Sequence, residues 1–385
     1  MKDFIKIFFT TALSLLLIAV VSIVITYAVN PDAIKDFIGQ VDKQETYDET
    51  NIEEFELEDG IITKYNGNDS VVVVPNSYTN EEGEEVTITV IGDSAFEHKP
   101  YLLKVILPEG ITTIDSRAFY FCTNLEEVIL PSTLEVIEND AFNLCTNLKA
   151  IELPETLTEI GNNAFRMCVD LKEINIPDSV TTLGTYIFYA DASLEKATLG
   201  NGITTIPEYT FYFCHSLKDL SLPTDLEEIG ISAFDFCDNL EKVTLPGTVT
   251  TLNNFAFNRC YSLREINLPE GLTTLGTYAF YGAKISSIEI PDGVTEIGAR
   301  AFQECTELKS IAFGKGLTTI ADSAFDNTIN VEKIIFNTTT PPTISSTLFD
   351  NMTNLKIYVP TSAVETYKTT WTQYAEIIFS VDELN

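Results

Sequence analysis

The chain of 385 residues has few of the side chains that enzymes use for acid–base or nucleophilic chemistry. It contains two histidines, His98 and His215, which lie far apart in the sequence and outside any recognisable motif. There is no G-x-S-x-G elbow, no H-E-x-x-H motif, no phosphate-binding loop and no D-x-D-x-D-G calcium loop. We therefore predict that the protein is not an enzyme and holds neither a metal nor a cofactor.

Basic residues are also scarce. The 23 Lys and Arg residues face 57 Asp and Glu residues, which gives a formal net charge of −34. Such a charge repels phosphate backbones, so we predict no nucleic-acid partner. The acidic excess is typical of a solvated surface, and attraction to cations or to a basic partner is the alternative interpretation.

What the sequence does have is a phenylalanine at a fixed interval. A constant period between 20 and 50 residues is the signature of a solenoid or another repeat array. The interval is 23 residues over nine copies and then 22, 23 and 24. These residues are Phe96, Phe119, Phe142, Phe165, Phe188, Phe211, Phe234, Phe257, Phe280, Phe302, Phe325 and Phe349.

One copy, residues 160–182, shows the repeating unit. Residues 174–176 alternate apolar, polar and apolar, which predicts a strand that ends at Pro177. Apolar residues between 160 and 171 recur at intervals of 3 and 4, which predicts one or two helical turns. The β-branched stretch 180–182 predicts a second short extended piece. One unit buries too little to fold alone, so the copies must stack.

The unit I-G-x-x-A-F-x-x-C-x-x-L-x-x-I-x-L-P resembles the BspA-like, or Treponema-type, leucine-rich repeat, over about residues 86–360. The resemblance implies a right-handed solenoid, which we expect to have about 12 coils. It also implies a concave parallel sheet on one face and short helical turns on the other. Members of this family are mostly bacterial surface proteins, and some are adhesins.

The seven cysteines fall in one column of the repeat, each three residues after a repeat phenylalanine. No C-x-x-C pair is present, and stacked equivalents point the same way, which disfavours zinc sites and disulfides. We interpret the cysteines as buried thiols, with disulfides between neighbouring coils as the alternative. They are Cys122, Cys145, Cys168, Cys214, Cys237, Cys260 and Cys305.

The amino-terminal part reads as a targeting segment. Lys2 and Lys6 precede an uncharged run over residues 7–29, long enough to span a bilayer. We predict a signal-anchor or transmembrane helix over 1–29, with the C-terminal part extracellular; a cleaved signal peptide and secretion are the alternative. Residues 30–55 form an acidic spacer.

The repeat region has different ends. We predict a β-rich N-terminal cap over 56–90, the solenoid over 91–360 and a C-terminal cap over 361–385. In the first cap, residues 61–65 and 71–74 are separated by a turn-forming stretch, which indicates a hairpin. In the last, Ser362 and Glu365 indicate a capping box for a short helix, and Trp371 is expected to cover the open end.

The candidate binding surface consists of variable polar positions on the predicted strands. Two of the copies also depart from the repeat: the fifth carries Asp191 in place of the cysteine, and the ninth lacks one residue around 282–285. The proposed partner-binding residues are Glu152, Glu173, Asn175, Lys196, Thr198, Asp219, Ser221, Lys242, Thr244, Glu265 and Asn267.

These observations predict a membrane-anchored extracellular protein that binds a protein or polysaccharide partner through its solenoid, as in adhesion. Changing Thr198, Lys242 and Asn267 together should then weaken binding. The alternative is a structural scaffold or spacer in a cell-envelope complex that makes its contacts through the membrane helix and the spacer. The sequence leaves the ligand and the oligomeric state open.

Overall fold

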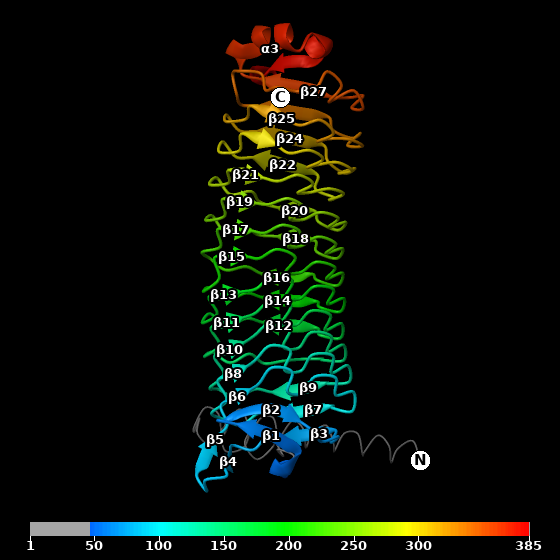
Figure 1. Ribbon diagram of the computed structural model, residues 1–385. Helices are drawn as coiled ribbons and strands as arrows, with labels where there is room; N and C mark the ends of the chain where they lie inside the picture. The colour runs from blue at the N-terminus through cyan, green and yellow to red at the C-terminus, as the bar shows by residue number, and fades with distance from the viewer. Residues whose placement is uncertain (1–46, 385) are drawn as a thin grey trace, which may run out of the picture. The chain divides into compact units, whose positions relative to one another are not determined.

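The computed structural model describes residues 47–384. The predicted membrane segment 1–29 and most of the acidic spacer lie outside these residues. Within residues 49–384 the chain forms one compact unit, a solenoid of about 13 turns whose coils stack on one another (Figure 1). The solenoid prediction is therefore confirmed for this unit, with about one more turn than expected.

No helix in the described part of the chain is both long and apolar enough to cross a membrane.

Most coils contribute a first strand to a parallel ladder, as the alternating pattern predicts; the coil that carries Glu152 has only an isolated bridge there, between Ala150 and Glu127. Equivalent residues of successive coils pair in register, for example Glu173 with Lys196 and then Asp219. The ladder is interrupted, so its strands form several short sheets. The strands are β3 (Val71–Val73), β7 (Lys104–Ile106), β9 (Glu127–Ile129), β12 (Glu173–Asn175), β14 (Lys196–Thr198), β16 (Asp219–Ser221), β18 (Lys242–Val243), β20 (Glu265–Ile266), β22 (Ser287–Ile290), β24 (Ser310–Phe313), β26 (Lys333–Phe336) and β27 (Lys356–Val359).

A second parallel ladder follows the proline of each coil. The short extended piece predicted after Pro177 is present as β13, which pairs with the equivalent strand of the coil before. The solenoid therefore has two parallel ladders rather than one. The second consists of β2 (Ile61–Tyr65), β6 (Val90–Ile91), β8 (Thr113–Ile114), β10 (Val136–Ile137), β11 (Glu159–Ile160), β13 (Thr182–Leu183), β15 (Thr205–Ile206), β17 (Glu228–Ile229), β19 (Thr251–Leu252), β21 (Thr274–Leu275), β23 (Glu296–Ile297) and β25 (Thr319–Ile320).

The predicted helical turns are wrong. In the copies from Phe96 to Phe325, the residues two before and two after the phenylalanine have positive φ, such as 56° at Asn163 and 60° at Met167, which no α-helix contains. The segment makes consecutive turns, and its remaining N–H groups bond to the next coil, as Phe165 N does to Ile187 O at 3.1 Å. A helix is about 10–12 Å wide, whereas stacked coils are about 4.8 Å apart, so a helix does not fit.

The core is built from the repeated apolar columns. The phenylalanine rings from Phe96 to Phe325 are fully buried and stack on one another, with centroids 5.0–5.9 Å apart. Each ring between these two ends stacks on a phenylalanine ring of the coil before and of the coil after, and Phe96 stacks on Tyr65 at the N-terminal end. Burial of these columns by neighbouring coils stabilises the array as a whole.

The N-terminal end contains two antiparallel hairpins, but not the predicted one. Strand β2 pairs with β1, whereas β3 pairs with β7 and so belongs to the first ladder. The Val–Pro that follows β3 matches the repeat, which explains why these residues join a coil. The elements are η1 (Ile52–Glu54), β1 (Phe55–Glu58), β4 (Ser77–Thr79) and β5 (Glu85–Thr87).

The C-terminal end closes the core. Trp371 is buried, with its ring centroid 5.2 Å from that of Phe336 and 4.9 Å from that of Tyr367, so its predicted place over the open end is confirmed. The capping box predicted at Ser362 is wrong: helix α3 has no side-chain cap, and the capping box forms at Ser380. The elements are η2 (Thr361–Ala363), α3 (Val364–Thr370), η3 (Thr372–Ile377), β28 (Ile378–Ser380) and η4 (Val381–Glu383).

Candidate functional site

The proposed partner-binding residues lie in successive coils along the first ladder. We call the solvent-exposed side chains of this ladder the sheet face. The alternation of each strand buries one residue between two outward ones, as Ile174 is buried between Glu173 and Asn175. All eleven candidates are exposed except Thr198, which is half-buried. The candidates therefore share one surface, and whether they bind a partner stays a prediction.

Charged side chains on the sheet face pair between coils. The amine of Lys104 lies 2.8 Å from the Glu127 carboxylate, and Lys242 lies 2.7 Å from Glu265. The hydrogen bond from Lys242 lowers the pKa of the Glu265 carboxyl. Because acidic and basic residues alternate here, much of the charge in the middle of the sheet face is neutralised locally.

An open groove of about 440 Å³ lies on the sheet face across β18, β20 and the start of β22. Four of the predicted residues line it, so the structure brings together Lys242, Thr244, Glu265 and Asn267. The sequence prediction did not include the other side chains of this groove. These are Val243, Arg264, Ile266, Ser286 and Ser287.

The groove lies where the first ladder is interrupted. Strand β20 is the last of one short sheet and β22 is the first of the next. The intervening coil is the one that lacks a residue, and Lys284 N bonds to Leu263 O at 2.8 Å, outside the regular 23-residue register. The 22-residue spacing was the signal in the sequence that pointed to this coil as irregular.

One predicted contact residue is already engaged by the fold. The Asn267 amide accepts a hydrogen bond from Leu245 N at 2.8 Å and donates one to Leu245 O at 2.9 Å. The Asn267 side chain therefore makes the hydrogen bonds to the Leu245 backbone that a neighbouring strand would otherwise make. Lys242, Thr244 and Ser287 have outward side chains beside it, and these are better placed to contact a ligand.

The chemistry of the groove is that of binding. Thr244, Ser286 and Ser287 line the groove together with the Lys242–Glu265 ion pair, and Arg264 pairs with Glu307 at 2.6 Å. Such groups donate and accept hydrogen bonds to a polar ligand. Between residues 47 and 384, no three His, Cys, Asp or Glu side chains are grouped as metal ligands.

The two histidines lie in the turns, in different coils. His215 Nδ1 is 2.7 Å from an Asp238 oxygen, and His98 packs against Phe121 with ring centroids 4.8 Å apart. Neither histidine lies among the residues that line the groove. Tyrosines in the turns also stack between coils: the ring centroids of Tyr186 and Tyr209 are 4.6 Å apart.

The cysteine column is buried and consists of free thiols, as predicted. Each thiol lies 3.0–3.3 Å from the carbonyl oxygen of a repeat phenylalanine of the preceding coil, to which it donates. Burial raises the pKa of the Cys122 thiol to about 12 and shifts the others in the same direction. These thiols are therefore poor nucleophiles and act as small core residues.

A parallel two-ladder solenoid with one residue of each core type per coil defines a protein of the leucine-rich-repeat class. The model of the BspA type leucine rich repeat region matches residues 79–195, 181–290 and 273–377. This match covers most of the chain, and the chain belongs to the BspA-type leucine-rich repeat family. Proteins of this family are generally binding scaffolds and typically surface-associated.

Solved structures share the fold. A leucine-rich repeat protein from Bacteroides ovatus is 27% identical, with a TM-score of 0.58 over 83% of this chain and 79% of its own. A leucine rich cell surface protein from Faecalibacterium prausnitzii is 26% identical, with a TM-score of 0.50 over 82% and 95%. The pneumococcal vaccine antigen PcpA, 20% identical over 87% and 97%, has a TM-score of 0.50 and shows likeness of fold alone. No curated protein matches the sequence.

Proposed function

We propose that this protein is a surface-exposed, non-enzymatic binding protein that holds a protein or glycan partner against its sheet face. The observation that carries the proposal is the polar groove over β18, β20 and β22, because it combines outward hydroxyl groups with a balanced ion pair at an interruption of the ladder. A ligand rich in hydroxyl or amide groups would find both donors and acceptors there.

Attachment to the cell surface is part of the proposal. The apolar run over residues 7–29, with Lys2 and Lys6 before it, would anchor the chain with the repeats outside the cell. The likeness to a cell surface protein of Faecalibacterium prausnitzii supports the same placement. An adhesive role would follow from a groove that faces the surroundings of the cell.

The test is a binding screen of the full-length protein against host-matrix proteins and cell-envelope polysaccharides. A ligand found in this way is then measured against a groove variant in which Lys242, Thr244 and Ser287 are changed to Ala. A matched control carries Ala at Thr205, Thr274 and Glu296, which are exposed on the second ladder. Loss of binding in the groove variant alone would support the proposal.

Two results would count against it. A screen with no binding to any ligand would remove the basis for a sheet-face site. Membrane pull-down of partners that survives the groove substitutions but disappears when residues 1–55 are deleted would favour a scaffold whose contacts lie in the anchor and spacer.

A further inference from the structure

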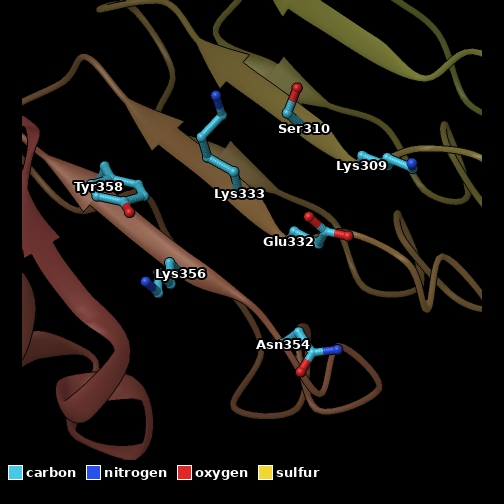
Figure 2. Close-up of a pocket in the computed structure, with 7 residues that line it drawn as sticks. All are labelled: Lys309, Ser310, Glu332, Lys333, Asn354, Lys356 and Tyr358. Carbon is cyan, nitrogen blue, oxygen red and sulfur yellow. The ribbon is translucent and has the colours of Figure 1, made fainter. Parts of the chain in front are cut away.

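A second groove, of about 620 Å³, lies on the sheet face near the C-terminal end and differs in charge from the rest (Figure 2). It crosses the starts of β24, β26 and β27. Three lysines line it, Lys309, Lys333 and Lys356, together with a single carboxylate, Glu332. The groove thus has an excess of positive charge in a chain whose formal net charge is −34.

The difference arises within one column of the ladder, at the first residue of each strand. Further along this column toward the N-terminus, Lys196 and Lys242 each have a carboxylate partner in the neighbouring coil. Lys333 instead has Ser310 on one side and Lys356 on the other, in direct register. Like charges at paired positions of a sheet destabilise it. The alternation of charges that neutralises the middle of the sheet face therefore ends here.

Within residues 47–384, none of the three groove lysines forms an ion pair. Lys309 and Lys356 are exposed and Lys333 is half-buried. The Lys356 amine lies 5.8 Å from the centroid of the Phe379 ring, a contact that leaves its charge without a counter-ion. A bound anion would supply this missing charge.

The remaining residues of the groove narrow the chemistry of that anion. Tyr358 lies beside the lysines on β27 and is half-buried, with its ring centroid 5.9 Å from that of Phe379. Its ring is apolar and its hydroxyl is polar. Ser310 and Asn354 add a hydroxyl and an amide (Figure 2). An aromatic face together with small polar groups suits the mixed apolar and hydroxylated surface of a sugar ring, and the lysines suit an acid group on it.

The carboxylates around the groove limit how closely spaced the negative charges of a polymeric ligand can be. Exposed charges act over about 8 Å at physiological ionic strength. The positive groove extends over neighbouring strands that are about 4.8 Å apart. The sheet face beyond it carries the exposed carboxylates of Glu289 and Glu265, of which Glu265 is paired with Lys242. A nucleic acid, with a charge every 1.7 Å of helix axis, would place phosphates over these carboxylates. A polymer with one carboxylate per sugar carries fewer charges over the same length and would be repelled less by these carboxylates.

We propose that the groove lined by Lys309, Lys333 and Lys356 binds an acidic polysaccharide through the carboxylates of its uronic-acid sugars. The site uses the same sheet face as the proposed function but different residues. Either proposal can therefore be refuted without the other. The groove variant at Lys242, Thr244 and Ser287 distinguishes them, because it leaves Lys309, Lys333 and Lys356 unchanged.

The experiment measures binding of polygalacturonate to the full-length protein at two salt concentrations. The variant Lys333→Gln/Lys356→Gln should raise the Kd at least about tenfold, because hydrogen bonds to charged groups are the stronger class. Lys333→Arg/Lys356→Arg should retain most of the binding. The matched control Lys149→Gln/Lys218→Gln removes two exposed lysines that already have carboxylate partners, and it should change the Kd by less than about twofold. Higher salt should weaken binding.

Several results would overturn the proposal. They are an absence of polygalacturonate binding, equal binding of neutral dextran, and unchanged binding by the Lys333→Gln/Lys356→Gln variant with its circular dichroism intact. Equal binding of poly-glutamate would point to an acidic protein segment instead, and equal binding of double-stranded DNA would contradict the argument from charge density.

Discussion

Replacing Asp191 by Cys should stabilise the protein, although the substitution removes the native residue. Asp191 occupies the cysteine column between Cys168 and Cys214 and is fully buried. One carboxylate oxygen accepts the Cys168 N–H at 2.8 Å, whereas the other has no hydrogen-bond partner. A thiol at this position has an acceptor available in Phe165 O, the counterpart of the carbonyls that the other cysteines use.

The expected gain in stability has two sources: the unpaired carboxylate oxygen of Asp191 and the proton that its buried carboxyl retains. Leaving a buried polar group unsatisfied costs about 1–3 kcal/mol, which Asp191→Cys should recover at every pH, before the effect of the proton is added. Burial raises the pKa of the Asp191 carboxyl well above its usual range. The folded chain therefore keeps a proton that the unfolded chain releases above about pH 3.9. Stability of the native sequence should fall as pH rises from there, by up to about 1.4 kcal/mol per pH unit, until the pH passes the folded-state pKa.

Guanidinium unfolding of the full-length protein at pH 5, 6 and 7 measures both effects. The stability difference between Asp191→Cys and the native sequence should widen from pH 5 to pH 6. Asp219→Asn, at an exposed position of β16, is the control and should show no such trend. Equal stability of Asp191→Cys and the native sequence at all three pH values would refute the account of this column.

Three further predictions concern the core. In Ellman titration all seven cysteines should be unreactive in the native protein and all seven should react after denaturation; fewer than seven would indicate a disulfide. Phe165→Ala should destabilise the protein by about 3–5 kcal/mol, because its ring is stacked 5.4 and 5.7 Å from its neighbours, whereas Tyr101→Ala, at a position 67% exposed, should have little effect on the unfolding midpoint. Burial raises the pKa of Asp235 to about 7, so Asp235→Asn should flatten the loss of stability between about pH 4 and pH 7; an unchanged pH profile would contradict this.

Strands and core columns could be predicted because each is specified by local periodicity. Residues 174–176 alternate between apolar and polar, which shows the buried face of the strand. An equivalent of Phe165 recurs once in each coil, which shows that equivalent residues stack on one another. The turns could not be predicted in the same way. Apolar spacings of 3 and 4 are shared by a helix and by the consecutive turns around Asn163 and Met167, and only the spacing of the coils decides between them.

The groove over β18, β20 and β22 was predicted in part. Outward positions such as Lys242 and Thr244 follow from the strand alternation, which places them on one face. The missing residue of the ninth copy was visible, but a deletion does not itself show which ladder it interrupts. The hydrogen bonds of Asn267 to Leu245 also depend on that interruption, so the engagement of Asn267 by the fold was not foreseen.

The central claim is that a partner binds the sheet face at the groove over β18, β20 and β22. The most direct test is the ratio of the Kd values of the groove variant and of the second-ladder control for the same ligand. Each variant removes three outward polar groups, of which one is charged, so the number of substitutions and the loss of surface polarity are matched, although the sign of the removed charge differs. We predict a loss of at least about tenfold, equal to about 1.4 kcal/mol, in the groove variant and less than about twofold in the control. Equal Kd values for the two variants would contradict the account.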